Sequence, residues 1–195
     1  MTDNSEFANA GSIHGRFQPF HNGHLEYLQG ALARCDYLYV GVTQFRRRQL
    51  VQVSSTSAVH RALPESNPLS YFERLTILQA LFASLGIDAS RYCVVPFPIE
   101  EPQELSDFLP TSVRVFTTTY DSWNKAKIEL LRSYGYEVEN LWSRDAKLIS
   151  GQQVRDLLRA DDAGWRDLVP PAVADVLAQF EIGERLRALA LRGGR

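Results

Sequence analysis

The chain has 195 residues, 45% of them hydrophobic, which suits one domain with a sizeable core. Its net charge of −2 argues against a nucleic-acid binder with a broad basic face, and its two cysteines form no CxxC spacing, which argues against a disulfide framework or a zinc site. The polar start and the lack of any long apolar run exclude a signal peptide and a bilayer-spanning helix, so we expect a soluble, cytoplasmic, enzyme-sized domain that binds neither nucleic acid nor membrane.

Strand-like and helix-like stretches alternate along the sequence. A strand is expected at 12–17, then a helix at 24–34 with leucines at i, i+3 and i+7, then a strand at 36–43. A long loop at 44–69 precedes a helix that begins with a Ser70–Glu73 capping box and ends near Gly86. The later part of the chain predicts strands at 92–98, 112–119 and 136–142, and helices at 101–109, 122–134, 150–160 and, as one last helix, 171–191.

This alternation predicts an α/β fold: a Rossmann-like, doubly wound parallel sheet of about five strands, with helices on both faces and a C-terminal helical cap. We expect one single domain over 1–195, with the Rossmann-like core at 12–150 and a C-terminal helix and helical cap at 150–195. Sheets of this kind bind ligands at the carboxyl ends of their strands, where the strand order reverses.

The stretch "GRFQPFHNGH", residues 15–24, follows the first predicted strand. It places His21 and His24 at the entry to a helix, where free backbone amides and the helix dipole attract phosphate. Gly23 leaves room for a ligand, and Arg16 can add a charged contact. A buried corner with a satisfied core histidine is the ordinary alternative. A metal pair is a weaker one, because the known helical zinc pair has i, i+4 spacing.

A second stretch, "ISGQQVRDLL" at 149–158, also has the form of a phosphate-binding helix start. Ser150 is a good N-cap, Gly151 permits close approach, and Arg155 lies one turn further on. An ordinary amphipathic helix would show the same apolar positions, and the two readings are compatible.

These motifs resemble those of the HxGH nucleotidylyltransferase superfamily, in the form closest to archaeal-type nicotinamide-nucleotide adenylyltransferases, with a cytidylyltransferase-like fold. The second stretch is similar to that family's ISGTxxR segment. "NPLSYFERL", at 67–75, is similar to its Asn-Pro-Phe-Thr helix start with a Glu-Arg pair. The similarity in order and spacing extends from about residue 12 to residue 173.

The resemblance implies a reaction in which an acceptor's phosphate oxygen attacks the α-phosphorus of a nucleoside triphosphate and pyrophosphate leaves. The nucleophile is already an anion, so catalysis consists of positioning and charge stabilisation. It implies catalytic roles for His21, His24, Arg16 and Arg155, and Mg²⁺ bound mainly through the triphosphate with no metal ligand from the protein. The nucleotide and its phosphates are expected to contact Gly15, Phe17, Gln18, Gly23, Thr118, Asp121, Ile149, Ser150, Gly151 and Gln152.

The acceptor side of the site is expected at other positions. The hypothesis is that the 44–69 loop closes over the acceptor and that its arginine run binds an anion, although such runs are more often solvated surface. Trp123 is equally suited to ring stacking and to helix packing. The expected acceptor-binding residues are Arg46, Arg47, Arg48, Asn67 and Trp123.

Three functions stay open. The leading one is adenylyl transfer from ATP to nicotinamide mononucleotide, giving NAD. The second, an alternative, is cytidylyl transfer from CTP to a small phosphate or phosphonate. Three departures from the family weaken the first function: no tryptophan at 98–110, Gln152 in place of threonine, and a longer 44–69 loop. The third is a catalytically silent nucleotide sensor. A homo-oligomer is possible, because the stripe Val173, Val176, Leu177 and Phe180 fits either an intrachain cap or a subunit contact.

Overall fold

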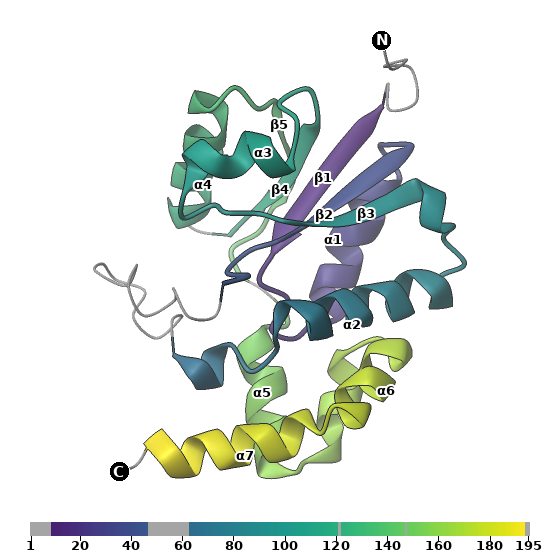
Figure 1. The fold of residues 1–195 in the computed structure, drawn as a ribbon, viewed down its shortest axis with the longest axis vertical. Coiled ribbons are helices and arrows are strands. Elements are labelled where there is room, and N and C mark those ends of the chain that lie inside the picture. Colours follow the sequence, from purple (N-terminus) through teal and green to yellow (C-terminus); the bar gives the residue numbers. More distant parts are fainter. Residues whose placement is uncertain (1–8, 47–62, 121, 147, 194–195) are drawn as a thin grey trace. The chain divides into compact units, whose positions relative to one another are not determined.

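The computed structural model describes residues 9–46, 63–120, 122–146 and 148–193 (Figure 1). The strands are β1 (Ala10–Gly15), β2 (Tyr37–Val42), β3 (Tyr92–Pro96), β4 (Arg114–Thr119) and β5 (Val138–Ser143). The α-helices are α1 (Asn22–Leu32), α2 (Tyr71–Ser84), α3 (Leu105–Phe108), α4 (Ser122–Ser133), α5 (Gly151–Ala160), α6 (Pro171–Gln179) and α7 (Ile182–Gly193). Short 3-10 turns are η3 (Pro64–Ser66), η4 (Ala89–Arg91), η5 (Pro102–Glu104) and η6 (Ala163–Leu168).

The chain divides into two compact units. The first comprises the described residues within 1–15, 26–43 and 88–147, and the second those within 16–25, 44–87 and 148–195. The first unit holds the sheet. The second holds α2, α5, α6 and α7, so it is larger than the C-terminal cap expected from residue 150 onward.

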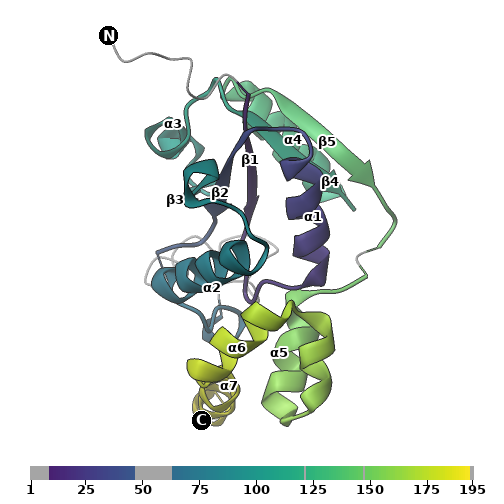
Figure 2. The ribbon, with the colours of Figure 1, turned by 90° about the vertical axis from the view of Figure 1, so that its right-hand side faces the viewer.

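All five strands of the first unit are parallel, in the order β3-β2-β1-β4-β5. The connection from β1 to β2 runs toward one edge of the sheet, and the connection from β4 to β5 runs toward the other edge. Because both crossovers are right-handed, their helices α1 and α4 lie on opposite faces. Figure 2 shows α1 and α3 on opposite sides of the strands. The predicted doubly wound α/β sheet is confirmed, and its strand order reverses between β1 and β4.

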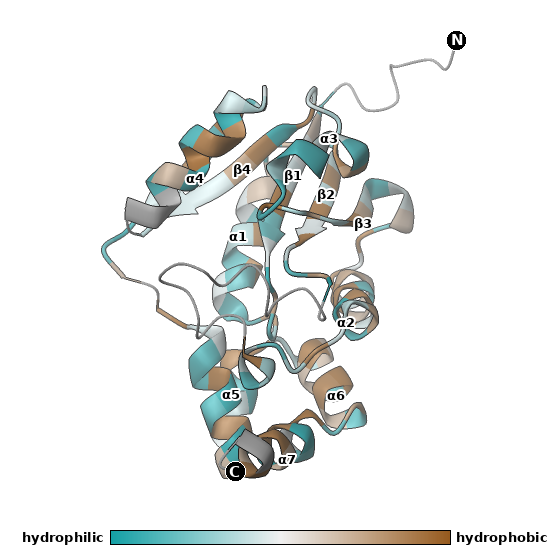
Figure 3. Cartoon of the chain, turned by 60° about the vertical axis from the view of Figure 1, so that its left-hand side comes forward, coloured by the Kyte–Doolittle hydropathy of each residue, from teal (hydrophilic) through white to brown (hydrophobic). Residues whose placement is uncertain are grey.

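Apolar strand residues hold the first unit together on both faces. On one face, Phe97 and Val115 pack into a buried cluster with residues of α3 and α4, including Leu105 and Leu131. On the other face, the hydroxyl of Tyr27 in α1 donates to the carbonyl of Phe116 at 2.5 Å. The apolar strand interiors are brown in Figure 3.

Two helices of the second unit begin with the expected caps. In α2, the Ser70 side chain accepts from the amide of Glu73, whose carboxylate accepts from the Ser70 amide. In α5, Ser150 and Gln153 make the same reciprocal pair. Each pair satisfies two backbone donors that a helix start would otherwise leave unbonded.

The prediction of one last helix from 171 to 191 is wrong, because the chain forms two helices, α6 and α7. Glu181 lies between them with a left-handed φ of 51°, which ends the first helix although this position is neither glycine nor proline. The stripe of Val173, Val176 and Leu177 is buried within the chain, and α6 packs against α2 and α7. These three residues therefore serve in an intrachain cap, whereas Phe180, the fourth member of the stripe, is half-buried.

None of the helices in the described residues is long and apolar enough to cross a membrane.

Candidate active site

Both histidines of the first motif lie at the start of α1. His21 occupies the N-cap position, where its carbonyl accepts from the amides of His24 at 2.8 Å and Leu25 at 3.1 Å. The two imidazole rings stack with their centroids 3.7 Å apart. The sequence prediction that both imidazoles gather at one helix N-terminus is thus correct in geometry. At this helix end, the amide groups and the dipole favour an anion.

A backbone hydrogen bond orients the His24 ring. The amide of His21 donates to Nδ1 of His24 at 3.3 Å. His24 is the third residue of the helix, so its side chain takes the place of the Glu or Gln that completes a capping box. Because Nδ1 accepts, the ring proton of the neutral imidazole is on Nε2. His24 therefore offers an N–H donor away from the helix backbone, which is what a phosphate oxygen requires.

Two phenylalanines fix the position of this ring. Phe17 contacts His24 edge-on with centroids 5.0 Å apart, and Phe20 lies 5.3 Å away. Both phenylalanines are buried. Phe17 has a left-handed φ of 49°, so the strand ends at Gly15 and not at residue 17 as expected. The turn at Phe17 directs the chain into the helix start.

The second motif lies against the first within the second unit. A β-carbon on Gly23 would lie 3.7 Å from the carbonyl oxygen of Ile149, and one on Gly151 would lie 2.9 Å from the carbonyl oxygen of Gln18. Gly151 therefore permits a backbone approach that a β-carbon at this position would push apart. The N-termini of α1 and α5, each with an anion-favouring dipole, are brought close together by these contacts.

Arg155 has a different place from the one expected. It is buried, and its two terminal nitrogens donate to the carbonyl of Gln18 and to the side chain of Gln152, both at 2.6 Å. Burial lowers the pKa of Arg155 from its usual value, yet an arginine keeps its charge. Through its two terminal nitrogens Arg155 holds the two motifs together, while its Nε has no hydrogen-bond partner in the described residues. Its expected role at the phosphates stays a prediction.

Arg74, to which sequence reasoning gave no role, bonds the backbone of the first motif. Arg74 is completely buried in α2. Its guanidinium donates to the carbonyls of Arg16 at 2.8 Å, Gln44 at 3.0 Å and Ser70 at 3.3 Å. It thereby joins the first motif to the start of the 44–69 loop. The only signal in the sequence was the Glu-Arg pair at 73–74, next to the capping box.

Further contacts hold the Asn67–Leu69 segment beside the first motif. The Gln18 side chain donates to the carbonyl of Leu69 and accepts from its amide, both at 2.9 Å. Gln18 thus acts as a structural clamp. Asn67 is buried, and its side-chain Nδ2 donates to the carbonyl of Leu63 at 3.1 Å. Its side chain thus takes part in holding the turn.

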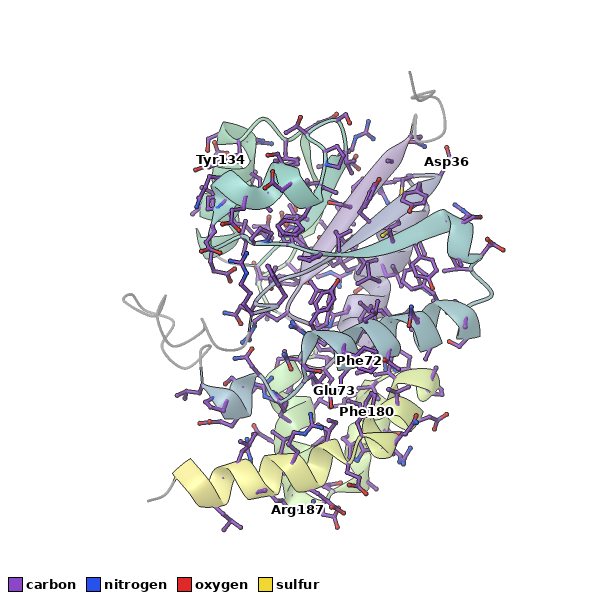
Figure 4. All side chains as sticks on the ribbon, in the orientation of Figure 1. Asp36, Phe72, Glu73, Tyr134, Phe180 and Arg187 are labelled. Carbon is purple, nitrogen blue, oxygen red and sulfur yellow. The ribbon has the colours of Figure 1, made fainter. Side chains whose placement is uncertain are left out.

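An ion pair ties α7 to the start of α2. Arg185 contacts both carboxylate oxygens of Glu73, at 2.6 and 2.9 Å, and also donates to the carbonyl of Pro68 at 2.9 Å. Glu73 is labelled in Figure 4. Burial by itself would raise the pKa of Glu73, but hydrogen bonds from Arg185 and Ser70 outweigh it and hold that pKa below the usual value.

The other expected site residues are distributed as follows. Thr118 is half-buried on β4 in the first unit. The guanidinium carbon of Arg46 lies 5.0 Å from the centre of the Phe45 ring. Arg47, Arg48 and Asp121 lie outside the described residues, as does the side chain of Trp123. Their expected roles stay predictions.

Gly151→Ala tests the close approach of the two motifs. The new methyl group would press on the Gln18 carbonyl and displace the start of α5, at a cost of about 1–3 kcal/mol. If this helix start binds the triphosphate, we expect the triphosphate KM to rise about 5- to 100-fold. Gly164→Ala is the control, because its nearest neighbour is a side-chain oxygen of Asp162, which can move. An unchanged KM in Gly151→Ala would remove α5 from the triphosphate site.

The first unit is thus a doubly wound α/β sheet, and the second unit brings together two helix starts that favour an anion. Residues 13–169 match the family described as Cytidylyltransferase-like. The chain is 40% identical over 183 residues to a phosphonoformate cytidylyltransferase of Streptomyces viridochromogenes, covering 94% of this chain and 98% of the relative. It is 29% identical over 177 residues to a nicotinamide-nucleotide adenylyltransferase of Pyrobaculum neutrophilum, covering 90% and 91%.

A solved structure has the same fold. The bifunctional NMN adenylyltransferase/ADP ribose pyrophosphatase of Francisella tularensis superimposes with a TM-score of 0.64 at 14% identity, over 95% of this chain. This chain spans about half of that protein, 54% of its length.

The chain belongs to the Cytidylyltransferase-like family. It is a nucleotidyltransferase, as the motifs predicted.

Proposed function

We propose that the protein transfers CMP from CTP to an oxygen of a small phosphonate or phosphate acceptor, with release of pyrophosphate. The observation that carries this proposal is the 40% identity to a phosphonoformate cytidylyltransferase over nearly the full length of both chains. The relatives named as nicotinamide-nucleotide adenylyltransferases are less similar, at 29% and 27%. For this reason we place cytidylyl transfer before adenylyl transfer, although both fit the family.

The described residues suit this chemistry. The acceptor oxygen is already an anion, so the protein must position it in line with the α-phosphorus and stabilise the charge in transit. The Nε2–H of His24 and the backbone amides at the start of α1 would donate to the α-phosphate. The helix start at Ser150 would hold the outgoing pyrophosphate. Arg74, Gln18 and Arg155 keep these groups in place through their bonds to backbone atoms.

Mg²⁺ is the metal that we expect with the triphosphate. It prefers oxygen ligands, whereas the first motif supplies imidazole nitrogens and a guanidinium, groups suited to phosphate oxygens. Among the described residues, no three histidines, cysteines or carboxylates gather as a metal site. The donor set thus suits an ion carried by phosphate oxygens and water, which would neutralise charge on the triphosphate.

A second candidate is adenylyl transfer to nicotinamide mononucleotide. It is supported by similarity to several nicotinamide-nucleotide adenylyltransferases over about 90% of this chain. The segment after β3 has no tryptophan to stack on a nicotinamide ring. Loss of such stacking weakens binding by about 1–3 kcal/mol, whereas a phosphonate has no ring to stack.

Pyrophosphate release tests the two candidates. Each of the four triphosphates would be assayed against phosphonoformate, methylphosphonate, phosphocholine and nicotinamide mononucleotide. We expect kcat/KM for CTP with a small phosphonate to exceed that for ATP with nicotinamide mononucleotide by at least about tenfold. The reverse ratio would make the protein an adenylyltransferase, and the absence of turnover with every pair would favour a nucleotide sensor.

A further inference from the structure

The two central strands of the first unit, β1 and β4, are not paired with each other toward their carboxyl ends. In the described residues, β1 pairs with β2 from Ala10 to Gly15, but with β4 only at Gly11 and Ser12, opposite Arg114 and Val115. Both β1 and β4 continue beyond that pairing. In doubly wound sheets, ligands bind where the strand order reverses, and here the reversal lies between β1 and β4.

Three polar side chains line one face of the sheet at this point. Ser12 is paired with Val115, so their side chains share a face, and it is the face covered by α3 and α4. Side chains two residues further along a strand point the same way, which adds His14 and Thr117. Ser12, His14 and Thr117 form what we call the switch-point triad. In Figure 3, β4 changes from brown to pale toward its arrowhead.

The triad is buried, but its polar atoms have no hydrogen-bond partner in the described part of the chain. Ser12 and Thr117 are 0% exposed and His14 is 7% exposed. The Ser12 and Thr117 hydroxyls and both ring nitrogens of His14 are without a partner there. Thr119, on the same strand and the same face, shows the usual arrangement: its hydroxyl donates to Asn140 at 3.1 Å. Buried polar groups left unbonded by protein require another explanation.

The surroundings of His14 hold its ring in one orientation. The imidazole stacks on Phe97 with centroids 4.5 Å apart and an angle of 3°. Phe97 can lie there because position 41 is a glycine, whose added β-carbon would come within 2.6 Å of the Phe97 ring. A rigid aromatic support of this kind would orient the ring nitrogens of a ligand-binding histidine.

The chemistry of the triad suits an anion. Burial, and secondly the charge of Lys127 on α4, holds the pKa of His14 well below its usual value, so the ring is neutral. A neutral imidazole supplies one N–H donor, and each hydroxyl supplies one more. Three donors and a nearby lysine charge complement a carboxylate, which accepts through both of its oxygens.

We propose that the switch-point triad binds the carboxylate of a small acceptor that carries both a carboxylate and a phosphonate. This inference rests on the proposed transfer to a phosphonate. The buried donors of the triad, which have no protein partner in the described residues, carry this inference. The triad determines acceptor specificity and takes no part in the bond changes at phosphorus.

Thr117→Val and His14→Leu test the proposal, because each removes the donor and keeps most of the side-chain volume. With phosphonoformate as acceptor, we expect the acceptor KM to rise about tenfold in each variant, while the KM for CTP changes less than about twofold. With methylphosphonate, which has no carboxylate, the variants should match the wild type. Thr119→Val is the control, since its hydroxyl already has a protein partner, and it should leave both acceptor constants unchanged.

Thermal unfolding and direct binding add readouts independent of turnover. The Thr117 hydroxyl stabilises nothing in the described protein, so Thr117→Val should keep or raise the Tm while weakening phosphonoformate binding in calorimetry. A lower Tm with unchanged binding would give the hydroxyl a structural role and overturn the proposal. Equal losses for both acceptors would also overturn it. If the wild type used no phosphonate with CTP, the proposed function itself would be wrong. If the wild type were active and the variants were unaffected, only the role of the switch-point triad would be wrong.

Discussion

Replacing His24 with alanine is expected to lower turnover by about 10²- to 10⁴-fold. The reason is the fixed direction of its donor. The His21 amide occupies Nδ1, and Phe17 and Phe20 hold the ring, so Nε2–H is preorganised for a phosphate oxygen. A preorganised donor stabilises the transition state without reorganisation at the moment of reaction. Steady-state kinetics with saturating triphosphate and acceptor would measure the loss.

His24 also caps α1, so the alanine variant could lose turnover simply because the helix start frays. His24→Gln separates the two effects. A glutamine at the third helical position accepts from the N-cap amide, as in an ordinary capping box, so the Tm should stay near that of the wild type. Turnover should still fall by at least about 10²-fold, because the imidazole is gone. Near-normal turnover in the glutamine variant would show that His24 acts only as a cap.

The second large effect is expected from Arg74→Met, which keeps the apolar stem and removes every donor. Its guanidinium bonds three backbone carbonyls in a fully buried position, and one of them belongs to Arg16. Buried carbonyls left without a partner make the free energy of unfolding fall by about 3 kcal/mol. Because the first motif would shift as well, kcat/KM should fall about 10²-fold. Urea unfolding and steady-state kinetics would measure the two losses.

Arg159→Met is the matched control on α5. Arg159 makes a surface pair with Asp156 at 2.8 Å, and such exposed pairs contribute little, so the change in unfolding free energy should stay within about 0.5 kcal/mol. Arg74→Lys keeps the charge but lacks the forked geometry of the guanidinium. Its free energy of unfolding should therefore lie between those of Arg74→Met and the wild type. A wild-type urea midpoint in Arg74→Met would show that water replaces the guanidinium without loss.

The features that the sequence alone determined are local ones. The Ser70–Glu73 capping box, the N-cap at Ser150 and the stop at Gly86, with a φ of 66°, all formed as predicted. Each depends on atoms within about four residues of one another, so the residue types and their spacing suffice to predict them. The gathering of His21 and His24 at one helix start follows from the same short spacing.

Contacts between residues far apart in the sequence became known only from the tertiary structure. Arg155 bonds the carbonyl of Gln18, 137 residues away in sequence, and Arg74 bonds that of Arg16, 58 residues away. Neither partner could be read from a motif, because a backbone carbonyl leaves no signature in the sequence. The break at Glu181 was also hidden, since the one glycine beside it, Gly183, is a residue that a continuous helix tolerates. His14 looked like one more residue of a strand, and burial without a protein partner became visible only once the strands on either side of it were in place.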